Sequence, residues 1–201
     1  MIVSLSDASS VIRIWADSSF WAAPVCQMWR SLTSATAGIA SRSFRTWMKS
    51  IPGGTGYITR KIAAKIGATG TIYGVEIQQE MLDKWTKQMA GSAAGSATPV
   101  LGTTTDPKLP PASCDTLIMV DVYHEFDFPI EMVQHMIDAL KPGARIVFVE
   151  YRKEDPAVPI KELHKMTVVQ VKKEMAVHPH LQYVETIATL PRQHIIVFKK
   201  I

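Results

Sequence analysis

The residues best suited to chemistry gather in one short stretch near the middle of the chain, residues 121–126 (DVYHEF). An imidazole ionises near neutral pH, so His124 can take a proton from an oxygen or nitrogen nucleophile. Tyr123 can offer its ring face or its oxygen to a cation. Glu125 can orient His124, cap the next helix or face a substrate. Core packing does not require so many polar groups in one loop, and we therefore predict that this loop is functional.

A second candidate site is the turn Gly53-Gly54-Thr55-Gly56, which lies between a predicted strand and a predicted helix. Glycines let the backbone turn tightly and approach a ligand, and the helix start adds exposed N–H donors. Glu76 ends the next β-rich run, and an acid at this spacing can accept two hydrogen bonds from a ribose diol. Together the turn and Glu76 predict a site for a nucleoside cofactor.

Three further residues follow predicted strands or stand in the loops after them. Asp106, in the loop 102–110, can border an adenine ring or cap a turn. Tyr151 follows the run 144–150 and can present its ring to a cation. His164 stands in the irregular segment 156–166, where it can face a substrate or simply pack. By its position, this segment is a candidate lid over the site.

Strand-like and helix-like runs alternate from about residue 47, which is typical of a parallel sheet covered by helices. The last two runs are joined by so short a segment that we expect an antiparallel pair. Residues 91–98 (GSAAGSAT) predict a flexible loop, residues 141–143 (KPG) the end of a helix, and Thr167 with Gln170 a capping box. We predict helices at 57–66, 79–89, 129–140 and 168–176, and strands at 71–76, 100–101, 116–121, 144–150, 181–188 and 194–200.

The glycine turn does not fit a dinucleotide site well. A nicotinamide-binding fingerprint requires a third small residue, where this chain has Thr59, and the turn holds no basic residue for a pyrophosphate. A nicotinamide-dependent oxidoreductase is therefore the least favoured of the three functions that we consider. A cofactor with a ribose and no phosphate fits better.

These motifs resemble those of the class I S-adenosylmethionine (SAM)-dependent methyltransferases. The turn 53–57 is similar to their motif I, Glu76 to their ribose-binding acid, and Asp121 to the motif after their fourth strand. One bacterial-type subfamily is similar over about residues 53–201. The matching stretches are GTGYITRKIAAKIGATGTIYGVEIQQEML, DPKLPPASCDTLIMVDVYHEFDFP, LKPGARIVFVEYRKEDPAVPIKELHKM and LPRQHIIVFKK.

The resemblance implies a Rossmann-like α/β fold with three layers, α/β/α, and a mostly parallel seven-stranded sheet whose last strand is antiparallel. It also implies SAM as cofactor and methyl transfer to an oxygen, nitrogen or carbon nucleophile of a small molecule. The acceptor would contact Glu125, Tyr151 and His164, with His124 and Tyr123 catalytic. The expected cofactor-binding residues are Gly53, Gly54, Thr55, Gly56, Tyr57, Glu76, Ile77, Asp106 and Asp121.

The chain departs from the family at the start of motif I. Family members usually have an acid and a glycine where this chain has Ser50 and Pro52, and residues 47–49 make a poor central strand. Proline lacks an N–H and restricts φ, so the turn can be distorted. The alternative function is therefore a methyltransferase-fold protein that binds SAM weakly or does not catalyse.

We divide the 201 residues into an N-terminal segment, 1–46, and a methyltransferase domain, 47–201. The first segment is rich in serine and tryptophan, which allows a capping segment, a targeting segment or an altered start. Two cysteines exclude a disulfide framework and a four-cysteine zinc site, and we predict no metal. Basic residues are scattered, so no nucleic-acid partner is expected. We expect a cytoplasmic protein without a transmembrane segment.

Overall fold

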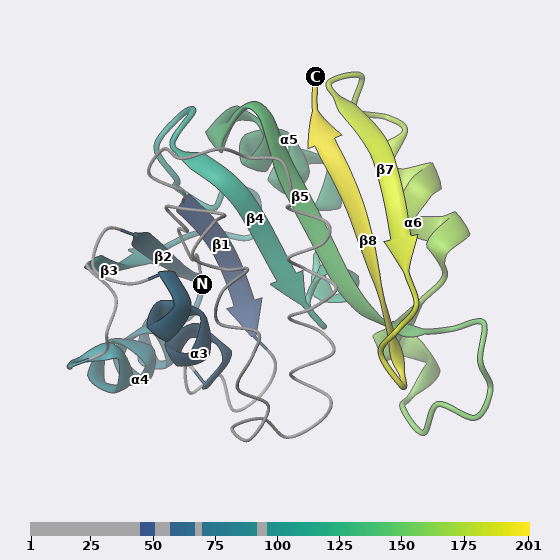
Figure 1. Cartoon of the computed structure of the whole chain (residues 1–201), viewed down its shortest axis with the longest axis horizontal. Helices are drawn as coiled ribbons and strands as arrows, with labels where there is room; N and C mark the ends of the chain where they lie inside the picture. Colours follow the sequence, from purple (N-terminus) through teal and green to yellow (C-terminus); the bar gives the residue numbers. More distant parts are fainter. Residues whose placement is uncertain (1–44, 51–56, 67–69, 92–95) are drawn as a thin grey trace.

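A single mixed sheet forms the centre of the protein (Figure 1). The structure is a computed structural model that describes residues 45–50, 57–66, 70–91 and 96–201. The strands lie in the order β3-β2-β1-β4-β5-β8-β7, and the short β6 pairs with β5 beside this path. They are β1 (Arg45–Ser50), β2 (Thr71–Glu76), β3 (Ser96–Leu101), β4 (Cys114–Val120), β5 (Leu140–Arg152), β6 (Lys165–Met166), β7 (Leu181–Ile187) and β8 (Gln193–Lys200).

The direction of the strands brings several strand ends to one edge of the sheet. The pairs β1–β2, β1–β4, β2–β3 and β4–β5 are parallel, whereas β8 runs antiparallel to both β5 and β7. The predicted main sheet of seven strands with a reversed last strand is therefore confirmed, and β6 is an addition to it. The carboxyl ends of β2, β1, β4 and β5 meet at the lower edge in Figure 1.

Strand β1 corrects the expectation that residues 47–49 make a poor central strand. It lies between β2 and β4, and five of its residues, Thr46 to Ser50, pair in register with Thr116 to Val120 of β4. A buried strand such as β4 must have its backbone groups hydrogen-bonded on both sides. The need of the neighbouring strands for partners outweighs the weak local preference of this segment.

Helices cover both faces of the sheet, as the alternation of side chains in β4 requires. Ile118 and Val120 belong to the core under α3 (Tyr57–Ile66) and α4 (Gln79–Met89). Leu117 and Met119 belong to the core under α5 (Pro129–Ala139) and α6 (Val168–Met175). Successive residues of a strand point to opposite faces, so each buried strand contributes to both cores.

The contact between α4 and β2 fixes the strand that carries Glu76. The indole N–H of the buried Trp85 donates to Oγ1 of the buried Thr59 at 3.2 Å. Its ring lies against Gly74 so closely that a Cβ there would meet the ring at 2.6 Å. Glycine at position 74 therefore permits this close approach of helix and strand.

Three local predictions need correction. Strand β3 begins at Ser96, inside the expected flexible loop. Residues 141–143 do not end α5; they form the irregular start of β5, where Gly143 has φ +78° and the register with β4 shifts. Of the capping box at Thr167, the structure shows one half: the Thr167 side chain accepts the Gln170 N–H, whereas the Gln170 side-chain amide donates to Glu174.

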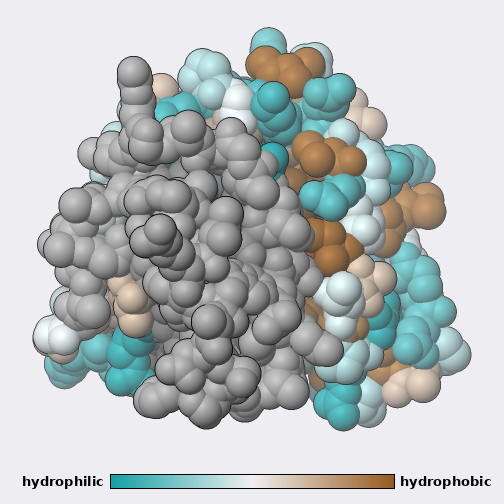
Figure 2. Space-filling view, viewed as in Figure 1, coloured by the Kyte–Doolittle hydropathy of each residue, from teal (hydrophilic) through white to brown (hydrophobic). Residues whose placement is uncertain are grey.

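The far edge strand β7 exposes both polar and apolar side chains. Tyr183 and Val184 in β7 are 37% and 39% exposed and stand between Gln182 and Glu185. On the corresponding side of the molecule, hydrophobic and hydrophilic residues intermix (Figure 2). Charged residues on an edge strand oppose pairing with another chain. Among the described residues, no helix has both the length and the apolar character to cross a membrane.

We expect Thr167→Ala to lower the free energy of unfolding by about 1 kcal/mol, because the Thr167 side chain accepts the Gln170 N–H at 2.9 Å at the start of α6. Thr167→Ser keeps the acceptor oxygen and is the matched control. Urea unfolding of the two variants and the native chain measures the difference. If Thr167→Ala and Thr167→Ser have the same free energy of unfolding, the hydrogen bond of the Thr167 side chain does not stabilise the protein.

Candidate active site

The buried carboxylate of Glu150, at the end of β5, organises the site. Its side chain is 0% exposed, and Oε1 accepts the backbone N–H groups of Val122 at 3.2 Å and Tyr123 at 2.8 Å. Oε2 lies 2.6 Å from Nδ1 of His124. All three donors belong to the loop after β4, so one carboxylate holds this loop against β5. Our sequence prediction missed Glu150, although the run 144–150 ends in an acid just as the run 116–121 does.

His124 lies between Glu150 and His164. Its Nδ1–H donates to Glu150, and its Nε2 faces Nδ1 of His164 at 3.1 Å. Burial alone lowers the pKa of His124, but the hydrogen bond to Glu150 and the charges of Glu150, Glu125 and Asp121 outweigh burial and raise it. His164, in the 3₁₀ turn η5 (Glu162–His164), is exposed. The structure thus brings together two predicted residues that are far apart in the sequence.

Tyr123 does not face the crevice, contrary to our prediction. It lies in the 3₁₀ turn η4 (Tyr123–Glu125) and is 3% exposed. Its ring packs edge-on against Phe126 and Phe148, with centroids 5.5 and 4.9 Å away. Burial, followed by a hydrogen bond to Glu174, raises the pKa of its phenol. The side chain is part of the core under α6, and we leave it out of the mechanism.

Asp121 combines burial with a strained backbone. It is 3% exposed and has φ +49°, a conformation that non-glycine residues rarely adopt. Oδ2 accepts from Nε2 of Gln193, whereas the buried Oδ1 has no partner among the described residues. Burial and then the charge of Glu150 raise the pKa of Asp121 to about 7, although the Gln193 bond lowers it. A buried carboxylate oxygen without a partner among the described residues is available to accept a hydrogen bond from a ligand.

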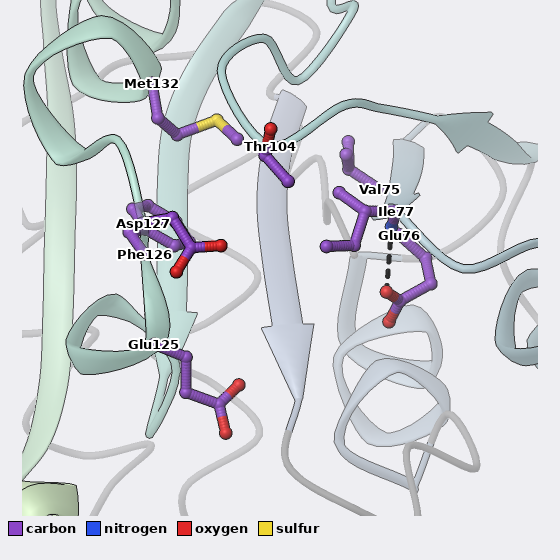
Figure 3. A pocket seen from close by; sticks show the side chains of 8 residues that line it. All are labelled: Val75, Glu76, Ile77, Thr104, Glu125, Phe126, Asp127 and Met132. Carbon is purple, nitrogen blue, oxygen red and sulfur yellow. Dashed lines mark hydrogen bonds between the residues drawn. The ribbon is translucent and has the colours of Figure 1, made fainter.

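A pocket of about 400 Å³, including its open mouth, lies between the ends of β2 and β4 (Figure 3). On one side Oε1 of Glu76 accepts the backbone N–H groups of Ile77 at 2.8 Å and Gln78 at 3.3 Å. Glu125 stands on the opposite side, with β1 between the two carboxylates in this view. The pocket is lined by Val75, Glu76, Ile77, Thr104, Glu125, Phe126, Asp127 and Met132.

The loop between β3 and β4 corrects the prediction for Asp106. Its Oδ1 accepts the backbone N–H of Lys108 and its Oδ2 pairs with Nζ of Lys108, both at 2.7 Å. Asp106 therefore caps a turn and does not line the pocket. Thr104 from the same loop does.

The remaining predicted residues lie at the same edge of the sheet or outside the description. Tyr151 is half-buried opposite Gln193 of β8, and burial, then the charge of Asp121, raises the pKa of its phenol. Tyr57 is the first residue of α3. Gly53, Gly54, Thr55, Gly56 and the N-terminal segment lie outside the described residues, apart from β1.

Comparison with known proteins gives a domain match and a shared fold. Residues 50–146 match the family model described as a methyltransferase domain. A SAM-dependent methyltransferase from Aquifex aeolicus superposes with a TM-score of 0.69 at 14% identity, over 78% of this chain and 82% of that one. One from Mesorhizobium loti superposes with a TM-score of 0.63 at 14% identity, over 87% and 98%.

Residues 50–146 thus match a methyltransferase domain, and the chain has the fold of the class I SAM-dependent methyltransferases. The cofactor of this family is SAM. The described residues of the methyltransferase fit it, because the pocket offers an acid at the end of β2 beside apolar walls, and the buried Oδ1 of Asp121 awaits a donor or a cation. No curated protein gives a significant sequence match.

The fold by itself does not fix the reaction. The cyclase SpnF superposes with a TM-score of 0.63 at 11% identity, over 77% of this chain and 74% of SpnF. Function must therefore be argued from the site of the methyltransferase, not from its fold.

We expect the stability of the SAM-free methyltransferase to fall between about pH 4 and pH 7 because of Asp121. Its pKa is raised from 3.8 to about 7, so over this range the folded chain keeps a proton that the unfolded chain has released. The contribution is fully present below pH 4 and is lost above pH 7. At about 1.4 kcal/mol per pKa unit it amounts to at most ~4 kcal/mol.

Asp121→Asn removes this titration, so its stability relative to the native chain should be higher at pH 8 than at pH 5. Urea unfolding at the two pH values measures the difference, and Asp127→Asn, at an exposed acid, is the control. If the difference in unfolding free energy between Asp121→Asn and the native chain is the same at both pH values, the raised pKa of Asp121 is contradicted.

Proposed function

We propose that the methyltransferase transfers the methyl group of SAM to an oxygen, nitrogen or acidic carbon nucleophile of a small molecule bound beside His124. The observation that carries this proposal is the hydrogen-bonded series Glu150–His124–His164, which lies at the same edge of the sheet as the pocket. It gives a proton acceptor next to the expected cofactor site.

The pocket takes the nucleoside end of SAM in this proposal. Glu76 binds the ribose hydroxyls through Oε2, since its Oε1 is already engaged by backbone N–H groups. The apolar side chains of Ile77, Phe126 and Met132 form walls for the adenine ring. The methionine part of SAM lies toward Asp121, whose Oδ1 accepts from a donor or a cationic group of the cofactor. Gly53, Gly54, Thr55 and Gly56, which the sequence predicts as cofactor ligands, lie outside the described residues. When bound, SAM supplies an electrophilic methyl group.

The protein's part in the reaction is orientation and proton transfer. Nε2 of His124 accepts the proton as the nucleophile attacks, and Glu150 stabilises the imidazolium that forms. Glu150 also holds the ring in place through Nδ1, so the base needs no reorientation. Glu125, Tyr151 and His164 border the space beside His124 and contact the acceptor.

His124→Ala should reduce turnover by about 10²–10⁴-fold, the range typical of a general base, and leave SAM affinity within a few fold. The measurement is methyl transfer in an acceptor screen together with calorimetric titration of SAM. His180→Ala, at an exposed histidine after α6, is the matched control and should keep full activity. Unchanged turnover in His124→Ala would remove this residue from the mechanism.

Titration of the native chain with SAM separates catalysis from the alternative of an impaired cofactor site. We expect saturable binding, because the pocket and Asp121 are in place, and weaker binding in Glu76→Ala. The variant Ser50→Asp/Pro52→Gly restores the family pattern at the end of β1. Binding that appears only in this variant would support the alternative and contradict the proposed activity.

A further inference from the structure

We propose that His124, Glu125 and His164 form a binding site for a divalent transition-metal cation. This cation site goes beyond the proposed methyl transfer and does not require it. Two of the ligands follow β4 and the third stands in η5, which β6 ties to β5. The predicted absence of a metal rested on the small number of cysteines, and the sequence could not show that these three residues meet.

The distances between the ligand atoms suit one cation. Nε2 of His124 and Nδ1 of His164 are 3.1 Å apart, and one ligand atom from each of the three residues lies within 4.8 Å of the others. Zinc–nitrogen bonds of about 2.0–2.1 Å place two neighbouring ligand atoms of one metal about 3 Å apart. The imidazole pair therefore already has the spacing of two ligands on a shared cation.

Glu150 prepares His124 for this role. Metal-binding histidines usually donate their other ring N–H to a carboxylate, which fixes the tautomer and the orientation of the ring. Here Nδ1–H of His124 donates to Glu150 at 2.6 Å, so the lone pair of Nε2 points away from Glu150 toward His164. The side chains of His124 and Glu150 are 6% and 0% exposed, so the surrounding core holds this geometry.

The ligand types indicate the class of cation. Two imidazoles and one carboxylate favour Zn²⁺, Co²⁺, Ni²⁺ or Fe²⁺, whereas Mg²⁺ and Ca²⁺ prefer oxygen ligands. Three protein ligands leave at least one position open to water or another small ligand. The negative charges of Glu125 and Glu150 offset the charge of the cation.

Occupancy of this site and proton transfer exclude one another. Nε2 of His124 has a single lone pair, which either binds the cation or accepts a proton. A bound cation also stands where the acceptor would lie. Zn²⁺ should therefore inhibit the methyltransferase, and enzyme freed of metal by a chelator should be the active form.

The binding test uses the full chain without a histidine tag, treated with a chelator and free of SAM and acceptor. Co²⁺ is followed by its visible absorption bands and Zn²⁺ by calorimetry. We expect one cation per chain, binding at least tenfold weaker in His164→Ala and in Glu125→Gln, and no change in His135→Ala, at an exposed histidine of α5. Glu150→Gln should weaken binding by about 10–100-fold.

His164 and Glu125 are exposed, so their variants should melt like the native chain, and Glu150→Gln is interpreted only if it does too. Native affinity in both His164→Ala and Glu125→Gln, or equal binding of Mg²⁺, would overturn the site and leave a simple hydrogen bond between the imidazoles. If Zn²⁺ binds at this site but increases turnover, the predicted inhibition is wrong. Because cation binding is measured without SAM or acceptor, its result does not depend on whether the proposed methyl transfer is correct.

Discussion

A buried carboxylate held by hydrogen-bond donors of one loop is the constraint on which this site depends. Glu150 has no contact with water, so its charge must be offset by hydrogen-bond donors. The donors are two backbone N–H groups and one imidazole of the loop after β4. That loop continues into Phe126 and α5, which form one wall of the pocket. The position of the loop after β4 and the shape of the pocket therefore share one cause.

The neighbouring strand end adds a second buried carboxylate. The charges of Glu150 and Asp121 oppose each other, and the surrounding core cannot screen them. Asp121 also has a left-handed backbone and a buried oxygen without a partner among the described residues. Such an arrangement costs stability and persists where a ligand benefits from it. A SAM-binding crevice is a natural place for it, because a sulfonium cofactor brings positive charge to the strand ends.

Local sequence patterns predicted most elements of the fold. They failed where contacts between segments that are far apart in the sequence determine the structure. Helix α4 and strand β2 have the expected bounds, because each has its own period and end signals. Strand β1 has no such pattern, and its place depends on β4. In the candidate site, the loop after β4 was singled out from its residue types. The inward turn of Tyr123 and the role of Glu150 were not, because both depend on how β4, β5 and α6 pack together.

The short strand β6 divides the site into two parts that can change separately. The chain leaves β5 after Arg152 and returns beside it at Lys165, one residue after His164. The intervening segment passes outside the sheet, whereas the pocket for the nucleoside end is built from β2, η4 and α5. Exchange of residues 153–163 for another sequence would thus leave the cofactor side intact and alter what stands next to His164. Under the proposed function, the segment that would contact the acceptor is therefore separate from the residues that would hold the methyl donor.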